Sequence, residues 1–400
     1  MRYPHTRGER MKYLTIDVET TISNKGNPFD KTNKLVMVGY KVYKTDTVTT
    51  HKIEYSVDPY KESLDNIQIA VDECDVLVGF NIKFDLHWLR RYGIKFNHKR
   101  IWDCQLAQYI LSYQENAYPS LNSTAEFYEL GTKLDEVKEN YWKNGIDTTE
   151  VPEEILTDYL VQDVKLTEQV MIMQQVEILK QPHLKRLLSL HNQDLLVLQE
   201  IEYQGMKYDY EHSKVLGDEL YEQIDKLNAR LLNHHAYPDF NPSSGEHLSA
   251  FLYGGIIKER FQRPIGHYKS GLRIGEVKYK WEEKDKEFPR RVAPLPKTEL
   301  KKGGFFSINE DTLKNLKPRT NEGKDILNII LTRSTLQKRM TTYYHGVPEL
   351  IDKMNWSGGI IHGQLNQCRT KTGRLSSSAP NLQNFDGEIK TLFPSRYGET

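Results

Sequence analysis

Apolar and polar residues alternate along the first fifty residues of the chain, which is typical of strands with one buried face. A short apolar run that contains a glycine follows near residue 78 and indicates a buried strand. Segments with helical periodicity lie directly before this run and after it. The predicted strands cover 13–18, 34–42, 48–53 and 76–80, and the predicted helices cover 62–73, 83–92, 103–112 and 152–180. This order predicts an α/β layer with a mixed sheet.

The second half of the chain has a mainly helical pattern. Helices are predicted at 183–205, 210–235 and 322–353, a strand is predicted at 358–367, and the last thirty residues show no regular period. Residues 240–248 have the composition of a helix start, in which Ser243 or Ser244 provides the cap. Residues 254–306 are rich in glycine, proline and basic side chains, and we interpret them as a long loop or a hairpin insertion.

The composition is that of a folded, polar protein. Of the 400 residues, 38% are hydrophobic, 28% are charged and 10% are aromatic, which excludes a disordered chain. No segment approaches the roughly 18 consecutive apolar residues of a membrane span, and the polar extension at 1–10 lacks the apolar core of a secretion signal. Three scattered cysteines fit neither a disulfide framework nor a zinc site, so we expect a cytoplasmic protein without membrane contact.

The net charge is zero, with 55 basic and 55 acidic residues, but the charges are unevenly distributed. Residues 101–170 hold 14 acidic and 4 basic side chains, whereas residues 256–302 hold 7 acidic and 14 basic side chains. A neutral total is therefore compatible with a metal-binding part beside a part that binds phosphates.

Two carboxylates stand at the end of the first predicted strand. Asp17 and Glu19 are two residues apart, so their side chains project from the same face of the strand. Like charges side by side are unfavourable unless a cation neutralises them. In a chain with this many acids, about two such triplets arise by chance, so the pair alone is a weak signal.

Two later elements carry further candidate residues. Asp85 lies in the first turn of a predicted helix, four residues after Asn81, where an acid also has an ordinary role as an acceptor for backbone donors. Tyr159 and Asp163 are four residues apart on a later predicted helix and therefore share a face. Taken alone, this second pair is better explained as a surface acid beside a half-buried tyrosine.

Considered together, the three motifs indicate a metal site. They occur in order along the chain, and each lies on the strand or helix from which its acids can reach a shared site. Four converging carboxylates can hold two divalent ions about 3.5–4 Å apart, which stabilise the attacking and leaving oxygens of a phosphodiester displacement. Mg²⁺ prefers oxygen ligands, so it suits this set of residues.

With these motifs, residues 11–175 resemble the proofreading 3′–5′ exonuclease domain of the DEDD superfamily, tyrosine subtype, which has an α/β RNase-H-like fold. The resemblance implies that two Mg²⁺ (or Mn²⁺) ions bind here. It implies that Asp17, Glu19 and Asp163 hold the first ion, that Asp17 and Asp85 serve the second, and that Tyr159 orients the attacking water. It also implies that the terminal nucleotide is lined by Thr20, Asn81 and Phe84.

Residues 372–384, TGRLSSSAPNLQN, combine hydroxyls, amides and one arginine around a glycine turn. Such groups contact phosphates and the minor groove, although composition alone also fits a serine-rich surface loop. The stretch resembles the segment that begins the palm of family A DNA polymerases, and 240–248 and 335–343 resemble the thumb. The resemblance implies that primer–template DNA is contacted by Lys338, Arg339, Arg374, Asn381 and Gln383.

The expected architecture is therefore an exonuclease domain at 11–180, a mainly α-helical thumb at 183–354 with a basic insertion at 256–302 along the DNA, and the beginning of an α+β palm at 355–400. The resemblance also implies that the chain ends before the polymerase aspartates, for which neither Asp386 nor Glu388 is placed to substitute. We therefore expect a split or truncated DNA replication polymerase with phage-like layout, in a phage-infected or bacterial cell. A second chain would carry the rest of the palm and the fingers.

Two other interpretations remain open. A stand-alone exonuclease or RNase with an accessory nucleic-acid-binding domain would have no use for the segment at 372–384. A DNA-binding clamp with a decayed exonuclease would have no reason to keep the full set of acidic residues and the tyrosine. Comparing the degradation of DNA and RNA oligonucleotides distinguishes the stand-alone exonuclease or RNase from the polymerase fragment. Undetectable Mg²⁺ binding would favour the clamp with a decayed exonuclease.

Overall fold

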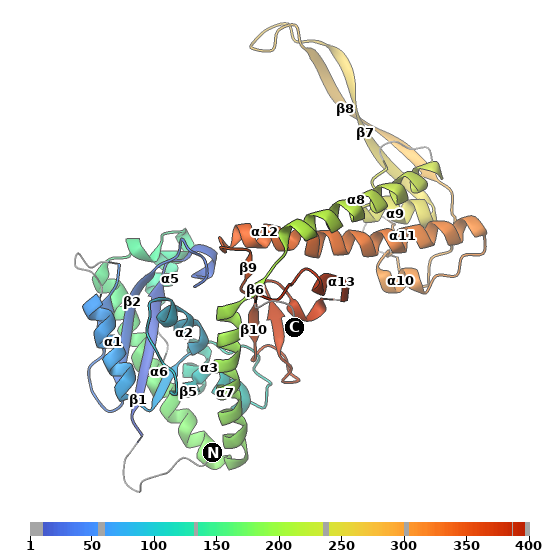
Figure 1. Ribbon diagram of the computed structural model, residues 1–400. Helices are drawn as coiled ribbons and strands as arrows, with labels where there is room; N and C mark the ends of the chain where they lie inside the picture. Colours follow the sequence, from blue (N-terminus) through green and yellow to red (C-terminus); the bar gives the residue numbers. More distant parts are fainter. Residues whose placement is uncertain are drawn as a thin grey trace. The chain divides into compact units, whose positions relative to one another are not determined.

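The computed structural model describes residues 11–54, 61–131, 135–234, 240–299, 304–385 and 387–396. The chain divides into two compact units, which are Met1–Tyr210 with Val347–Thr400, and Glu211–Gly346 (Figure 1). The polar extension predicted at 1–10, the end of the basic insertion at 300–302, and Asp386 lie outside the described residues. The domain boundaries expected from the sequence stay predictions.

A mixed sheet forms the centre of the first unit, as the sequence predicts. Its strands are β1 (Tyr13–Thr20), β2 (Leu35–Val42), β3 (Thr49–Lys52), β4 (Val76–Gly79) and β5 (Arg100–Asp103). Their order is β3-β2-β1-β4-β5, in which β1, β2 and β3 pair antiparallel, while β4 runs parallel to both β1 and β5. The central strand β1 therefore lies between an antiparallel and a parallel neighbour.

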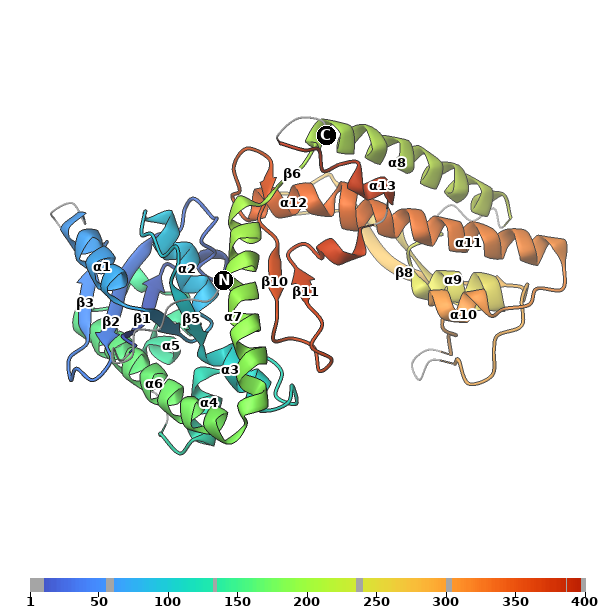
Figure 2. The ribbon, with the colours of Figure 1, turned by 60° about the horizontal axis from the view of Figure 1, so that its bottom comes forward.

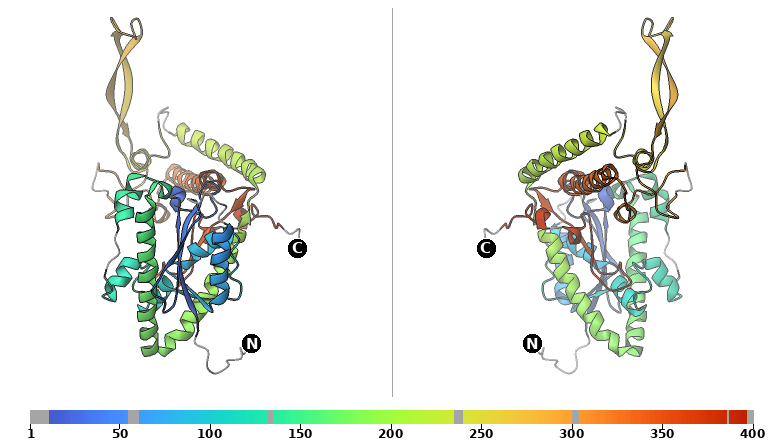
Figure 3. Two further views of the ribbon diagram at one scale, coloured as in Figure 1. Left: turned by 90° about the vertical axis from the view of Figure 1, so that its left-hand side faces the viewer. Right: turned by 90° about the vertical axis from the view of Figure 1, so that its right-hand side faces the viewer.

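The alternation along β1 divides its side chains between two helical layers. Leu14, Ile16 and Val18 belong to the core cluster that includes α1 (Lys61–Glu73) and α2 (Ile82–Arg91). The opposite face of the sheet is covered by α6 (Glu153–Lys180), whose buried residues include Leu156, Leu160 and Val164. Figure 3 shows α1 and α6 on opposite sides of the sheet. Asp17 and Glu19 therefore share the layer of α6.

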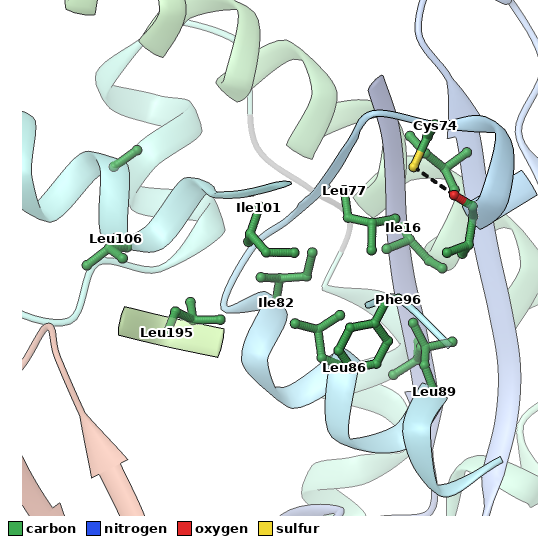
Figure 4. Packing of buried hydrophobic residues seen from close by; sticks show 14 of the residues in the cluster. Ile16, Cys74, Leu77, Ile82, Leu86, Leu89, Phe96, Ile101, Leu106 and Leu195 are labelled. Atoms are coloured by element: carbon green, nitrogen blue, oxygen red, sulfur yellow. Dashed lines mark hydrogen bonds between the residues drawn. The ribbon is translucent and has the colours of Figure 1, made fainter. Parts of the chain in front are cut away.

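The core on the α2 side brings together segments that are far apart in the sequence. Figure 4 shows how these side chains pack, with labels on Ile16, Cys74, Leu77, Ile82, Leu86, Leu89, Phe96, Ile101, Leu106 and Leu195. The dashed line there is the contact between Cys74 Sγ and the carbonyl oxygen of Val71, at 3.2 Å. Leu195 comes from α7 (Pro182–Gln204), so this long helix completes the same core.

Several short helices of the first unit have no counterpart in the predictions. They include α4 (Leu121–Phe127), α5 (Glu136–Asn140) and the 3-10 helices η1 (Ser23–Lys25), η2 (Trp142–Asn144) and η3 (Thr148–Glu150). The predicted helix at 103–112 forms as α3 (Cys104–Leu111). Helix α4 begins with a capping box, in which the side chains of Ser120 and Ser123 each accept from the other's backbone N–H. Helices this short contain too few turns for a 3.6-residue hydrophobic period to be recognised, so the sequence pattern does not predict them.

The C-terminal part of the first unit differs from the prediction of one strand at 358–367. That stretch forms β9 (Ile360–Ile361) and β10 (Gln364–Asn366), because β9 pairs with β6 (Met206–Lys207) while β10 pairs with β11 (Ser376–Ser378). The chain must turn between these two partners, so the strand cannot continue. The prediction that the last thirty residues are irregular is also wrong, since they contain β11, the short helix η5 (Leu382–Asn384) and α13 (Gly387–Lys390).

The second unit consists of helices (Figure 2) and a long hairpin (Figure 1). Its elements are α8 (Tyr210–Asn233), α9 (Gly245–Tyr253), β7 (Gly255–His267), β8 (Val277–Phe288), α10 (Glu310–Lys314), α11 (Asn321–Arg339) and the π-helical turn η4 (Met340–Tyr344). Ser244 caps α9 by accepting from the N–H of His247, so of the two predicted caps this one forms. The predicted helix at 322–353 is interrupted, since α12 (Gly346–Lys353) begins only after η4.

Across the parts of the chain that the structure describes, no helix combines the length and the apolar character that crossing a bilayer requires.

The buried side chain of Asp103 fixes the starts of two helices at once. It accepts hydrogen bonds from the N–H groups of Leu106 at 3.0 Å, Ile82 at 3.0 Å and Asn81 at 3.3 Å. Burial raises the pKa of Asp103 to about 6, although these backbone donors act in the opposite direction. Since Asn81 has a left-handed backbone with φ of 60°, the Asp103 carboxylate holds an unusual turn at the point where α2 begins.

We expect Asp103→Ala to speed local opening at the start of α2. Removing the carboxylate leaves buried N–H groups without an acceptor, which costs about 2 kcal/mol. Amide hydrogen exchange in peptides that cover 80–86 and 103–109 measures this effect. Asp103→Asn retains one acceptor oxygen and should lose less protection, whereas equal exchange in all three proteins would show that Asp103 does not hold this turn.

Candidate metal and nucleic-acid site

Three carboxylates from β1 and α6 meet in one place. Asp17, Glu19 and Asp163 each offer an oxygen, and these ligand atoms all lie within 4.8 Å of one another. Glu19 and Asp163 are almost fully buried, at 6% and 7% exposure, while Asp17 is half-buried. The group forms because Asp17 and Glu19 point from the sheet face that α6 covers, where Asp163 faces the strand.

Asp85, on α2, is not one of the three acids whose ligand atoms lie within 4.8 Å of one another, but it binds the same strand β1. Its Oδ1 accepts a hydrogen bond from the N–H of Val18 at 3.2 Å, in the strand segment between Asp17 and Glu19. Burial raises the pKa of Asp85 well above its ordinary value, and the negative charge of Asp17 raises it further. Two carboxylates that disfavour each other's ionised form are therefore held near one another.

Tyr159 stands one helical turn before Asp163 on α6 and is buried. Its ring makes an edge contact with Trp142, with the ring centroids 5.6 Å apart. Burial raises the pKa of Tyr159, and the charges of Asp163 and Glu19 raise it further. A tyrosine is protonated at neutral pH, and this raised pKa extends the protonated range to more alkaline pH, so the phenol is available as a hydrogen-bond donor.

The donor set suits a hard divalent cation. Asp17, Glu19 and Asp163 supply oxygen ligands, which Mg²⁺ and related ions prefer, and a cation would offset the repulsion among these acids. A soft metal would instead favour sulfur or imidazole ligands, which this group does not contain.

Of the predicted nucleotide-lining residues, Thr20 ends β1, whereas Asn81 and Phe84 lie at the start of α2. A Cβ atom on Gly26, whose φ is 65°, would lie 2.5 Å from Thr20 Oγ1 and 3.3 Å from Phe84 Cζ. Thr20 and Phe84 thus pack against the same glycine, which a larger residue could not replace. Asn81 lies at the start of α2, where its own backbone N–H binds Asp103.

The predicted DNA-contacting residues fall into both units. Lys338 and Arg339 are the last residues of α11 in the second unit, and Lys338 is exposed. Arg374, Asn381 and Gln383 belong to the first unit.

In the segment 372–384, much of the polar chemistry stabilises the loop itself. The Asn381 side chain accepts from the N–H of Gln383 at 3.2 Å, and Gln383 Nε2 donates to the carbonyl of Leu375 at 2.9 Å. Arg374 is exposed, and its carbonyl accepts from Thr370 Oγ1 at 2.8 Å. The guanidinium of Arg374 therefore lies at the surface of an internally bonded loop.

Sequence reasoning missed Glu202, a buried acid on α7 that connects α2 to β10. Its Oε1 lies 2.6 Å from Lys83 Nζ and accepts from the N–H of Leu365, while its Oε2 lies 2.8 Å from His87 Nε2. Lys83 also donates to the carbonyl of Leu365. Lys83 and His87 belong to the same helix as Asp85, so one side of α2 carries a candidate metal ligand and another side is anchored by Glu202.

The charge on Glu202 is maintained by its partners. Burial by itself would raise the pKa of Glu202, but the hydrogen bond with His87 and the charge of Lys83 outweigh it and hold the pKa below its ordinary value. The residue is only 5% exposed, so loss of the carboxylate would leave Lys83 without a buried counter-charge. No motif in the sequence distinguishes this glutamate from its neighbour Glu200, because only the tertiary packing buries one of them.

Two family matches agree with this geometry. Residues 5–176 match the 3′–5′ exonuclease family, and residues 286–396 match DNA polymerase family A. The chain is 28% identical over 320 residues to DNA polymerase I of Synechocystis sp. and 30% identical over 312 residues to DNA polymerase I of Chloroflexus aurantiacus. These alignments cover 78% and 76% of this chain but 28% of each relative, so the chain spans less than a third of their length.

A solved structure has the same fold. The POL domain of Pol1 from M. smegmatis, in complex with DNA primer-template and dNTP, matches with a TM-score of 0.66 at 16% identity. The match covers 96% of this chain and 54% of that chain. The group of Asp17, Glu19 and Asp163 lies within the first matched region, and the loop at 372–384 lies within the second. The chain therefore carries a 3′–5′ exonuclease domain followed by part of a family A DNA polymerase domain.

Proposed function

We propose that this chain removes nucleotides from the 3′ end of DNA by metal-dependent hydrolysis, as a proofreading exonuclease in DNA replication, and that its polymerase-like part binds primer–template DNA. The observation that carries the proposal is the convergence of Asp17, Glu19 and Asp163 within 4.8 Å inside the matched exonuclease domain. Asp85 beside them adds the fourth acid that this chemistry uses.

We assign different roles in hydrolysis to the acids, the tyrosine and the residues that line the nucleotide. Asp17, Glu19, Asp85 and Asp163 would hold Mg²⁺ or Mn²⁺, which supplies charge stabilisation and an activated water when bound. The hydroxyl of Tyr159, which is protonated at neutral pH as in any tyrosine and whose pKa is raised further, would orient the attacking water. Thr20, Asn81 and Phe84 would position the terminal nucleotide, so that its phosphodiester meets the carboxylates in a fixed geometry.

The finer assignments rest on particular residues. Tyr159 one turn before Asp163 supports the tyrosine subtype, and the four acids support two metal ions. The similar Pol1 domain is in complex with DNA primer-template, which supports duplex contacts at Lys338, Arg339, Arg374, Asn381 and Gln383. The phage-type layout, the cytoplasmic location and the second chain stay predictions, and the relatives named above are bacterial.

An RNase is the second candidate, because the carboxylates would serve it equally well. The match of 286–396 to a DNA polymerase family favours DNA. Comparing the degradation of DNA and RNA oligonucleotides of one sequence decides between them, and faster degradation of RNA would overturn the proposal.

We expect Asp17→Asn and Asp163→Asn to lower the rate of 3′-terminal hydrolysis by about 1,000-fold or more. Each substitution removes a charged ligand, and several kcal/mol of transition-state stabilisation depend on the bound cation. The assay uses a 3′-labelled single-stranded oligonucleotide with Mg²⁺. Asp158→Asn, an exposed position on the same helix, makes the same change in charge and should leave the rate intact. Unimpaired hydrolysis by Asp17→Asn would refute the metal assignment.

Tyr159→Phe tests the hydroxyl without altering the buried ring. We expect a loss of about 100-fold in kcat, because one preorganised donor is removed. The affinity for Mg²⁺, measured by calorimetry, should not change, since the carboxylates remain. A variant with unchanged kcat would remove Tyr159 from the reaction and with it the tyrosine subtype.

Glu202→Ala tests whether the anchor of α2 matters for hydrolysis. We expect kcat to fall by about 10-fold, because a loosened α2 misplaces Asp85, and a higher Mg²⁺ concentration should recover part of the loss. Glu202→Gln keeps the shape and an acceptor, so it should recover part of the rate. The control is Glu200→Ala on the same helix, whose exposed carboxylate pairs with Arg90 of α2. Equal effects of the Glu200 and Glu202 alanine variants would show that burial of the anchor is irrelevant.

A further inference from the structure

The hairpin of β7 and β8 has two chemically different faces. Along β8, basic residues occupy alternate positions, which place their side chains on one side of the ribbon. That side carries Lys278, Lys280, Glu282, Lys284 and Lys286, and the other side carries Val277, Tyr279, Trp281, Glu283, Asp285 and Glu287.

The register assigns the residues of β7 to the same two faces. Glu259 pairs with Lys284, Phe261 with Glu282 and Arg263 with Lys280, whereas Lys258 pairs with Asp285 and Arg260 with Glu283. Within 255–288, all of which the structure describes, one face thus carries five basic and two acidic residues in the paired strands. The opposite face carries two basic and three acidic residues. We call the first one the lysine face.

Local ion pairs increase the difference between the faces. On the opposite face, Glu283 bridges both Lys258 at 3.5 Å and Arg260 at 3.1 Å, so these two cations lie against an acid. On the lysine face, Glu282 lies 3.5 Å from Arg263, and the four lysines outnumber the remaining acid, Glu259. The lysine face therefore keeps a net positive charge along its length.

The ribbon beyond its base contributes little to the core of the second unit. Ile257 and Phe288 are buried at the base, where Phe288 meets Phe251 of α9 edge-on with centroids 6.0 Å apart. Lys278, Lys280 and Lys284 are exposed, as is the tip, and no helix covers the strands there in Figures 1 and 3. A two-stranded ribbon exposed on both faces gains little stability by itself, so packing does not explain its length.

The spacing of the lysines suits a polyanion with regular charges. Side chains two residues apart on a strand lie ~7 Å apart, which is about the axial rise of two phosphates along one strand of duplex DNA. A two-stranded ribbon also has the dimensions that a DNA groove admits. An acidic protein surface would need no such regular row, so the spacing favours a nucleic-acid backbone.

We infer that the lysine face of the β7–β8 hairpin binds the phosphate backbone of duplex DNA, while its opposite face, with Tyr279 and Trp281, points away from the duplex. The inference rests on the proposed function, because it assumes that the second unit works on primer–template DNA. It adds a defined surface to the residues at the end of α11, and it specifies which cations of the basic insertion make contact.

Two double variants of the full chain test the inference with equal changes in net charge. Lys280→Ala with Lys284→Ala removes two cations from the lysine face, and Lys258→Ala with Arg260→Ala removes two from the opposite face. Fluorescence anisotropy with a labelled primer–template gives the slope of log affinity against log salt concentration. We expect the first variant to lower the magnitude of the slope by about 1.8, at about 0.9 for each lost phosphate contact, and the second variant to leave it unchanged.

Equal slopes for the two variants would overturn the inference, because they would mean that only the overall charge matters or that the hairpin is remote from the DNA. A larger effect of the opposite-face variant would also overturn it. Hydrolysis of a short single-stranded oligonucleotide, measured on the same proteins, separates this outcome from a failure of the proposed function. Intact hydrolysis with equal slopes rejects the lysine face alone, whereas a wild-type chain that neither cleaves DNA nor binds duplex rejects both.

Discussion

Electrostatic repulsion between buried carboxylates is the constraint on which the first unit depends. The ligand atoms of Asp17, Glu19 and Asp163 lie within 4.8 Å of one another. Asp85 accepts a hydrogen bond from the backbone N–H of Val18 on the same strand. A flexible chain would move these charges apart, so the site requires rigid elements. The central strand of the sheet and the 28-residue helix α6 provide them, and the layers on both faces of β1 prevent either element from shifting.

The helix α2 is the part of this arrangement that needs most support, since its start has a strained backbone and its buried Asp85 has a raised pKa. Asp103 binds the first N–H groups of α2, and Glu202 binds two side chains further along the helix. Glu202 also binds Leu365, so the exonuclease helix and the polymerase-like segment share one buried anchor. Through Glu202 and Lys83, Leu365 of β10 is thus joined directly to the helix that carries Asp85.

The sequence predicts the parts of this fold that depend on local period. Strands β1 to β4 follow from alternation or from a short apolar run, and the long helices follow from amphipathic repeats, whereas β5 is not among the predicted strands. The shared face of Asp17 and Glu19 follows from the geometry of one strand. What it cannot predict depends on partners distant in sequence. Glu202 becomes an anchor only because α7 packs against α2, and the stretch at 358–367 breaks because its halves pair with different strands. The hairpin was expected as one of two options, but its lysine face depends on the register of β7 with β8.

The uneven distribution of charge has a consequence for substrate binding. The proposed site of hydrolysis consists of acids, of which only Asp163 lies in the acidic stretch 101–170, and these carboxylates would repel the DNA backbone unless cations neutralise them. Affinity for DNA must then come from elsewhere, and the basic residues of 256–302 are suited to supply it. Salt would accordingly weaken duplex binding through the basic region, whereas metal ions would be needed at the site of hydrolysis. Under the proposed function, the net charge of zero therefore combines two opposed requirements, since the basic region would attract the phosphate backbone and the carboxylates would accept it only together with a cation.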